Sequence, residues 1–343
     1  MIGGSHMCTA VSWNSGCHYF GRNLDLEYSY QEAVTITPRN FPLPFRALPS
    51  MDNHYAMIGI ATVVQDYPLY YDAVNEKGLC IAGLNFPGLA HYNKSQGIKD
   101  NVASFELIPW ILGQCCSVAQ AEELLHKVNI TDTAFRQDLP PTPLHWIIAD
   151  TERSITVEAM NDGLHIHQNP LGVLTNNPPF DYHLYHLRDY IQVGSAQAEN
   201  RFSKKLELTP YSNGMGGIGL PGDFSSASRF VRAAFVKLNS VAEIEEKKSV
   251  SQFFHILRAV AMPRGSVTMP DGRQEITLYS SCCNADLGIY YYTTYHNSRV
   301  CAVNMQQENL DGHQLISYPL LHQPDIYLQN HSLTKDGDQH DHF

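Results

Sequence analysis

Cys8 is the residue whose type and position could do the most chemistry, because it stands close to the front of the chain. The stretch before it, "MIGGSHM", has no helical or strand periodicity, and we interpret residues 1–7 as a cloning remnant that ends in the initiator Met7. Removal of these residues would leave a thiol and a free α-amine on Cys8. An α-amine has a pKa near ~8, so that close to neutral pH much of it can act as a base for the neighbouring thiol. This pairing predicts an N-terminal nucleophile.

Two charged residues in the segment "GRNLD" could support this nucleophile. Arg22 would favour the thiolate and Asp25 would hold and orient the α-ammonium, provided that their strand-like segment returns beside residues 8–13. The alternative for each side chain is a surface ion pair, which contributes under ~1 kcal/mol to stability.

A glycine pattern offers a different chemistry. Residues 214–219, "GMGGIG", match G-x-G-x-x-G through Gly214, Gly216 and Gly219, which would indicate an NAD-binding oxidoreductase. That fingerprint needs a buried strand before it and a helix after it, whereas "LELTPYSN" precedes it here and "LPGD" follows. We therefore predict a loop rather than a dinucleotide site.

Histidines raise two further alternatives, a metal site and a Cys/His enzyme. His165 and His167 should share one strand face, and the tail adds His340 and His342, but a third zinc ligand is not apparent. We expect these histidines to be exposed and to hold no metal. His145 in "PLHWII" is expected to be a core histidine with satisfied hydrogen bonds rather than a catalytic base.

The composition of the 343 residues excludes several classes of protein. A formal net charge of −11 argues against a nucleic-acid partner, because phosphate binding needs a basic face. No run approaches the ~18 apolar residues of a membrane helix and no apolar signal region follows the start, so we expect a soluble protein that is not exported. The eight cysteines include two adjacent pairs and are expected to be reduced core thiols, which indicates a cytoplasmic location.

The elements that must position Cys8 are predicted to alternate in blocks of strands and helices. Alternating or short apolar runs predict strands at residues 18–28, 32–40, 55–64, 77–86, 143–150, 154–160 and 163–168, and a pair or triplet within 274–305. Apolar stripes at helical spacing predict helices at residues 104–116, 117–129, 225–240 and 250–262.

Hairpin-length connections dominate between the predicted strands, which favours antiparallel sheets. Each predicted helix has one apolar stripe and needs a sheet face to cover. We therefore expect an α+β fold, a four-layer α/β/β/α sandwich of two mainly antiparallel sheets. It should form a single domain over residues 8–322, followed by a polar tail at 323–343.

A series of motifs extends the argument beyond Cys8. "MCTA" is followed in order by "FGRNLD", "VTITPRN", "AGLNFPG", "LTNNP", "GMGGIGLPGD" and "SSASRFVRA". This series, which runs from Cys8 to about Pro319, closely resembles the choloylglycine hydrolase family of bile salt hydrolases and penicillin V acylases. The resemblance implies the fold of the N-terminal nucleophile (Ntn) hydrolases and amide hydrolysis with no metal and no organic cofactor.

The same resemblance implies roles for six residues. These are Cys8 as the nucleophile, Arg22 as partner of its thiol, Asp25 as the group that orients its amine, Asn85 and Asn176 as the oxyanion hole, and Arg229 as part of the polar network. Two donors aimed at a tetrahedral oxygen would contribute several kcal/mol, since ~2.7–4 kcal/mol per donor is typical. Asn177, directly after Asn176, is a rival for the oxyanion role.

The resemblance also bears on substrate and partners. Asn85 stands where penicillin acylases of the family tend to carry Tyr, and segments 24–30 and 86–94 would line an apolar mouth suited to a steroid. We expect release of glycine or taurine from conjugated bile salts, with penicillin V hydrolysis as the alternative and a non-enzymatic bile-acid-binding protein as a more remote one. A homo-oligomer, specifically a tetramer, is implied, with residues 214–219 near its subunit contacts and no membrane partner.

Overall fold

Most strands of the described chain belong to two large antiparallel sheets. The computed structural model describes residues 7–97 and 99–330. The first sheet has six strands in the order β12-β1-β2-β13-β14-β15. Their bounds are Val173–Leu174 for β12, Met7–Ser15 for β1, Cys17–Leu26 for β2, Ile276–Asn284 for β13, Ile289–Thr294 for β14 and Cys301–Asn304 for β15.

The second sheet has eight strands in the order β11-β10-β9-β6-β5-β4-β3-β16. Their bounds are Gly163–Gln168 for β11, Ser154–Met160 for β10, Leu144–Ala149 for β9, Cys80–Asn85 for β6, Tyr67–Asn75 for β5, Met57–Val64 for β4, Ala33–Thr37 for β3 and Ile316–Pro319 for β16. A separate parallel pair consists of β7 (Asp100–Ala103) and β8 (Val128–Thr131).

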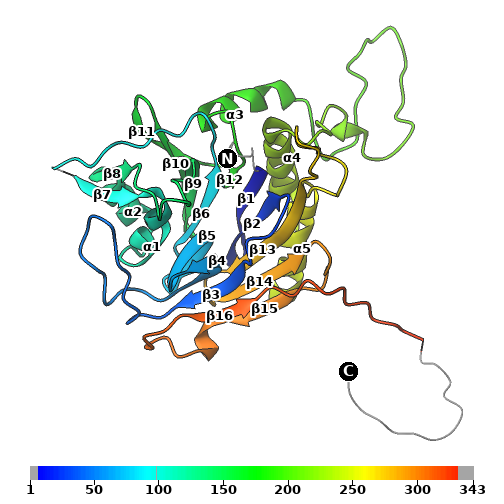
Figure 1. Ribbon diagram of the computed structural model, residues 1–343. Coiled ribbons are helices and arrows are strands. Elements are labelled where there is room, and N and C mark those ends of the chain that lie inside the picture. Colours follow the sequence, from blue (N-terminus) through cyan, green and yellow to red (C-terminus); the bar gives the residue numbers. More distant parts are fainter. Residues whose placement is uncertain (1–6, 98, 331–343) are drawn as a thin grey trace, which may run out of the picture.

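Helices cover the outer faces of both sheets. The α-helices are α1 (Leu107–Leu112), α2 (Val118–Leu125), α3 (Phe180–His186), α4 (Ser226–Asn239) and α5 (Glu246–Arg258), and the short 3-10 turns are η1 (Ser104–Glu106), η2 (Leu187–Tyr190), η3 (Met215–Gly217) and η4 (Met305–Gln307). Figure 1 shows α1 and α2 outside the eight-stranded sheet and α4 and α5 outside the six-stranded sheet. The two sheets pack on each other between these helices, which confirms the predicted α+β fold with its four layers.

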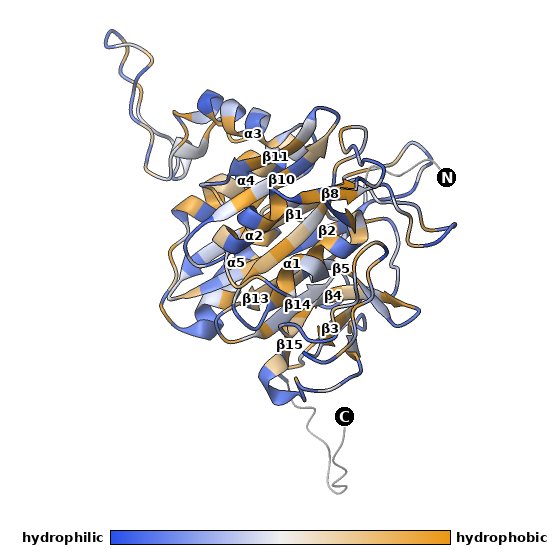
Figure 2. Cartoon of the chain, turned by 90° about the vertical axis from the view of Figure 1, so that its left-hand side faces the viewer, coloured by the Kyte–Doolittle hydropathy of each residue, from blue (hydrophilic) through white to orange (hydrophobic). Residues whose placement is uncertain are grey.

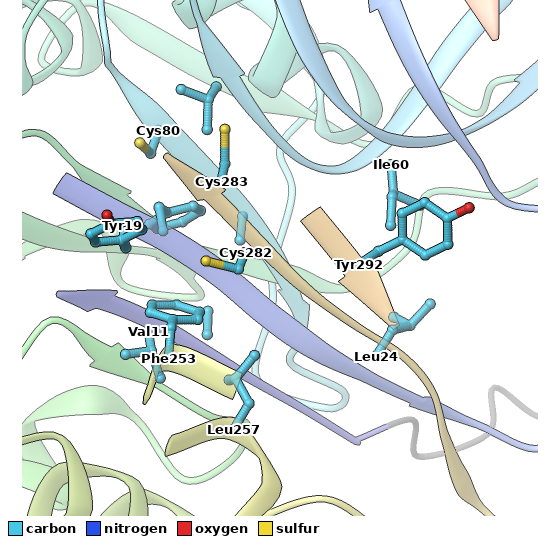
Figure 3. Close-up of a cluster of buried hydrophobic side chains, with 14 of the residues drawn as sticks. Val11, Tyr19, Leu24, Ile60, Cys80, Phe253, Leu257, Cys282, Cys283 and Tyr292 are labelled. Atoms are coloured by element: carbon cyan, nitrogen blue, oxygen red, sulfur yellow. The ribbon is translucent and has the colours of Figure 1, made fainter. Parts of the chain in front are cut away.

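The core consists of apolar side chains on both faces of each sheet. Successive residues of a strand point to opposite faces, and the neighbours Cys282 and Cys283 of β13 illustrate this. Figure 3 shows Cys282 on the side of Phe253 and Leu257 of α5, and Cys283 on the side of Cys80, which belongs to the other sheet. All five side chains are buried. The two cysteines are therefore core residues, as predicted, one on each face of the six-stranded sheet. All eight cysteines of the chain are free thiols.

Two of the covering helices, α2 and α4, begin within one residue of their predicted starts, whereas α1 begins three residues after its predicted start, behind the turn η1, and α5 begins four residues before its own. Ser117 caps α2, with its Oγ accepting a hydrogen bond from the backbone N–H of Gln120, and Pro109 occupies the first turn of α1, where proline is tolerated. Figure 2 views the molecule from the side of these two helices, where α1 is apolar throughout and α2 has both polar and apolar residues. No helix in the ranges 7–97 and 99–330 is both long and apolar enough to cross a bilayer.

One predicted helix is wrong over its last four residues. The expected helix over 117–129 ends at Leu125, and Val128–Thr131 instead forms β8 beside β7. The segment "VNIT" is rich in β-branched residues, which pack well on a pleated surface, and Val128 and Ile130 are buried there in the core under the eight-stranded sheet. Of the expected remnant at residues 1–7, Met7 begins β1 and residues 1–6 lie outside the described part of the chain, as does the end of the expected tail, residues 331–343.

Candidate active site

Cys8 lies in the interior, on the hairpin of β1 and β2. It is opposite Leu24 in the register of this hairpin, and the next pair along is Met7 with Asp25. Arg22 pairs with Ala10 on the same hairpin. The strand that carries Arg22 and Asp25 therefore returns beside residues 8–13, as the sequence predicted, and all three side chains are buried.

Asn176 and Arg229 bind the backbone of Cys8. The backbone N–H of Cys8 donates to Oδ1 of Asn176 at 2.8 Å, and the same oxygen accepts from Nη2 of Arg229 at 2.7 Å. Nη1 of Arg229 donates to the carbonyl oxygen of Cys8 and, at 2.8 Å, to Oγ1 of Thr9. Arg229 is fully buried at the start of α4, and Asn176 follows β12, so a loop and a helix together fix the position of the first residues of β1.

The Cys8 thiol lies in a field of opposing charges. Burial raises the pKa of this thiol, whereas Arg22, the backbone N–H of Asn85 and Arg229 act to lower it and Asp25 acts to raise it. Nη1 of Arg22 donates to two backbone carbonyls of the other sheet, those of Tyr71 at 2.9 Å and Gly83 at 2.6 Å. With the α-nitrogen still in a peptide bond, burial outweighs these cations and keeps the thiol protonated.

Asp25 has one carboxylate oxygen engaged and one without a partner. Oγ1 of Thr277 donates to its Oδ1 at 2.5 Å, and Oδ2 is buried and makes no hydrogen bond within the described residues. Burial raises the pKa of Asp25 to about 6, against the opposing influence of Arg229, Thr277 and Arg22. A carboxylate with a spare oxygen, opposite residue 7 on the hairpin, is suited to receive a positive charge near the start of β1.

The three candidate asparagines have distinct surroundings. Asn176 Nδ2 donates to the carbonyl oxygen of Asn85 at 2.8 Å, which leaves the second hydrogen of this amide for another acceptor. Asn85 ends β6 and brings its backbone N–H to the Cys8 sulfur. Asn177 Nδ2 instead donates to the carbonyl of Pro87 at 2.7 Å. Asn176 is thus the member of the pair that contacts Cys8, and the oxyanion role of Asn85 and Asn176 stays a prediction.

Glu275 is a residue at this site that the sequence analysis missed. Its carboxylate is fully buried, with Oε1 accepting the backbone N–H of Met7 at 2.6 Å and Oε2 without a hydrogen bond inside the described ranges. Burial raises the pKa of Glu275 to about 8. In the sequence it stands as an ordinary charged residue before a strand, and nothing there signals its reach across to residue 7.

The glycine pattern at 214–219 does not occupy the strand–turn–helix context of a dinucleotide site. The described residues just before it form no strand, and Met215–Gly217 is a 3-10 turn of three residues. The long segment from residue 191 to residue 223 extends away from the body of the molecule as an irregular loop (Figure 1). We refer to residues 191–223 as the arm.

The histidine alternatives resolve into local pairs. His145 is fully buried, with Nδ1 3.0 Å from Oε1 of Glu158 and Nε2 2.9 Å from the carbonyl oxygen of Thr175, so it is the satisfied core histidine that was predicted. His165 and His167 stack on one face of β11 and pair with Asp162 and Glu158 respectively. Across residues 7–97 and 99–330, no three His, Cys, Asp or Glu side chains gather as metal ligands would. His340 and His342 lie outside these residues.

These features define a class of protein. Two packed antiparallel sheets between helices place a buried cysteine at the start of the first strand, among two arginines, a carboxylate and amide donors. A covalent amide hydrolase uses a sulfur nucleophile, cations that favour its thiolate and donors for a developing oxyanion, so this constellation is the candidate site of such an enzyme.

Comparison with known proteins makes the assignment specific. The model of the choloylglycine hydrolase family, linear amide C–N hydrolases, matches residues 8–318, and the chain belongs to this family. It is 53% identical to the bile salt hydrolase/transferase of Lactiplantibacillus plantarum, over 94% of this chain and all of that relative.

Solved structures agree with the family assignment. The crystal structure of a variant of the conjugated bile acid hydrolase from Clostridium perfringens superposes with a TM-score of 0.87 at 38% identity, covering 94% of this chain and all of that one. The penicillin V acylase from Agrobacterium tumefaciens has a TM-score of 0.70 at 20% identity, covering 91% of this chain and 90% of the other. The second likeness shows a shared fold.

Proposed function

We propose that this enzyme hydrolyses the amide bond of glycine- or taurine-conjugated bile salts, with Cys8 as its nucleophile once residues 1–7 are removed. The observation that carries the proposal is the pair of contacts that Asn176 and Arg229 make with the nitrogen and carbonyl of Cys8, in a chain of this family. Similarity to the hydrolases of L. plantarum and C. perfringens supports the substrate class. The domain over residues 8–322 would act without a metal or organic cofactor.

The reaction would proceed by acyl transfer through Cys8. The thiolate attacks the amide carbonyl and forms the C–S bond, and the C–N bond breaks as the α-ammonium gives its proton to the departing amine nitrogen. A water then loses a proton to the same α-amine and attacks the thioester, which releases the bile acid and returns the sulfur as thiolate. Arg22 favours that thiolate, Asp25 orients the ammonium, and Asn176 and Asn85 donate to the oxyanion.

Exposed aromatic side chains on the chain that leaves β2, the strand of Asp25, support a steroid substrate. Tyr28 and Tyr30 lie two and four residues after the end of β2, are 46% and 42% exposed, and have ring centroids 4.9 Å apart. Exposed aromatic faces are the surface that an apolar ring system would cover. The alternative substrate within the family is penicillin V.

Product analysis with glycocholate, taurocholate and penicillin V under identical conditions tests this function. We expect free glycine or taurine from the bile salts at rates well above any opening of the penicillin V side-chain amide. Faster turnover of penicillin V than of both bile salts would replace the proposal by the acylase alternative. Binding of bile salts without release of amine would instead indicate a binding protein.

A second activity is proposed because the relative at 53% identity is named a hydrolase/transferase. A thioester on Cys8 can be attacked by an amine as well as by water, since both are nucleophiles that the α-amine can deprotonate. With excess free phenylalanine in the reaction, we expect some of the bile acid to appear as its phenylalanine conjugate, detected by mass spectrometry. Exclusive formation of free bile acid at every amine concentration would contradict this activity.

We also infer that the protein is a homotetramer of the cytoplasm. The arm carries exposed apolar side chains that a second copy could cover, namely Ile191, Phe202, Leu206, Leu208, Tyr211 and Ile218.

The cytoplasmic location is inferred from the eight free cysteines, because free thiols are typical of proteins in a reducing compartment.

A further inference from the structure

Asp72 is a buried carboxyl that the reaction above does not use. It lies on β5, is 1% exposed, and faces the six-stranded sheet across the space between the two sheets. Three hydroxyls of that sheet donate to it: Tyr290 to Oδ2, Tyr279 to Oδ1 at 3.4 Å and Ser281 to Oδ2 at 3.5 Å. Burial of a carboxylate is costly unless its charge and its lone pairs are matched, so this arrangement needs a reason.

Arg22 is the buried cation whose charge acts on Asp72, without an ion pair between the two side chains in the described residues. Its Nη1 donates to the carbonyl of Tyr71, the neighbour of Asp72 on β5, and its backbone N–H donates to Oγ of Ser281 at 3.1 Å, the same hydroxyl that donates to Asp72. Although burial acts to lower the pKa of Arg22, the anionic forms of Cys8, Tyr279, Asp72 and Tyr290 raise it above its usual value. Arg22 thus stands between Cys8 on one side and Asp72 with its tyrosines on the other.

Other titratable groups near Asp72 stay neutral. Burial raises the pKa values of Tyr279 and Tyr290 well above the ordinary tyrosine value. Burial likewise raises the pKa values of the thiols of Cys80 on β6 and Cys283 on β13, and the negative charge of Asp72 raises them further. The charges that change the field at Arg22 from this side are therefore those of Asp72 itself.

We propose that Asp72 acts on Cys8 through Arg22, and that its carboxylate limits how strongly the guanidinium favours the Cys8 thiolate. The proposal rests on the proposed role of Cys8. Burial raises the pKa of Asp72 to about 6, against the opposing effects of Arg22 and the three hydroxyls. Above this pH the carboxylate offsets Arg22, and below it the neutral carboxyl does not. Thiolate formation is thereby sustained as the pH falls.

The test is the rate at which iodoacetamide alkylates Cys8 in the chain that begins at residue 8, measured from pH 4.5 to 8.5 by the mass of the N-terminal peptide. Asp72→Asn keeps the size and one acceptor oxygen but removes the charge. Loss of a negative charge near Arg22 should lower the pKa of the thiol by about half a unit to one unit. We therefore expect alkylation about 3–10-fold faster than in the parent above pH 7, with the two rates converging below pH 5.5.

Tyr290→Phe gives an independent second variant. It keeps the charge of Asp72 but removes a hydrogen bond that stabilises the carboxylate, so the pKa of Asp72 should rise. Alkylation should then exceed the parent rate between about pH 6 and 7 and rejoin it at higher pH. If Asp72→Asn does not fold, Tyr290→Phe tests the effect of Asp72 on the Cys8 thiol, and an unchanged profile in Tyr290→Phe would overturn the proposal.

Matched controls come from buried groups that do not face Arg22. Tyr70→Phe, on the same strand, removes a hydroxyl that contacts Thr37, and Glu106→Gln removes a buried carboxyl beside the backbone of Arg46. Neither should change the alkylation profile. An unchanged profile in Asp72→Asn, or a change equal at every pH, would overturn the proposal and leave Asp72 a structural residue. Alkylation needs no turnover, so this failure is distinct from an absence of bile salt hydrolysis, which would refute the proposed function.

Discussion

Cys8→Ala, in a chain that begins at residue 8, is expected to lower the release of glycine or taurine from conjugated bile salts by about four orders of magnitude or more. Without the sulfur no acyl-enzyme can form, and what remains is substrate binding with the oxyanion donors. The contacts of residue 8 with Asn176 and Arg229 involve its backbone, so alanine should leave the local structure in place. The measurement is the initial rate of amine release at saturating substrate.

Cys17→Ala is the matched control for this substitution. Cys17 is a half-buried thiol at the other end of the same hairpin, opposite Ser15, and the side chains that act on it are Asn284, Asp286 and Glu246 rather than those described above around Cys8. Its replacement should leave the rate within about twofold of the parent, as expected for a side chain away from the reacting atoms. Comparable turnover by Cys8→Ala and by the parent would end the covalent mechanism.

Retention of Met7 is expected to abolish activity, by a factor on the order of 10² to 10⁴ or more. With Met7 in place the nitrogen of Cys8 is an amide whose N–H is donated to Asn176, and an amide nitrogen is not a base at neutral pH. The backbone of Met7 is also bound by Glu275, so the preceding residue occupies the space beside Asp25 where a free ammonium would lie. Cleavage of the bond between Met7 and Cys8 would free the α-amine that acts as the base, and would vacate the space beside Asp25 that this amine would occupy.

The comparison is between two preparations of one protein, the first beginning at residue 8 and the second retaining residues 1–7. Mass spectrometry of the intact chain establishes the N-terminus of each, and amine release from glycocholate or taurocholate gives the rates. Titration with iodoacetamide checks that the Cys8 thiol is accessible in both. A fully active preparation that still carries Met7 would show that the α-amine is not the base.

Much of the fold follows from local patterns in the sequence. The predicted segments that contain Arg22, Trp146 and Val157 are strands. They are short and rich in apolar residues, in alternation around Val157 and in a continuous run around Trp146, as is typical of strands in a core. The segment Val128–Thr131, which was predicted in part as a helix and is a strand, shows that a local pattern alone does not always decide between the two. Its apolar residues also fit one face of a helix, and pairing with β7, a distant segment, decides in favour of a strand.

The candidate site could be predicted only in part. The chemistry of the residues indicated Cys8, Arg22 and Asp25, the family motifs added Asn85, Asn176 and Arg229, and the structure brings all six together. Nothing in the sequence indicated a role for Glu275 or Asp72, because the importance proposed for them depends on their burial, which only the folded chain shows. The sequence also could not distinguish Asn176 from Asn177, because adjacent residues share every local property and differ only in the direction in which their side chains point.

The sequence by itself determined the type of chemistry: a cysteine that can become the first residue, charged partners on the returning strand, and alternating patterns that make two sheets. The tertiary structure alone decided which groups act on that cysteine, since the contacts of Cys8 with Asn176 and Arg229 join residues 168 and 221 positions apart. The tertiary structure also decided how readily these groups ionise, because burial has the largest effect on the pKa values of Cys8, Asp25 and Asp72. Burial and long-range contact arise only when the two sheets pack together, and neither is a property of any short stretch of chain.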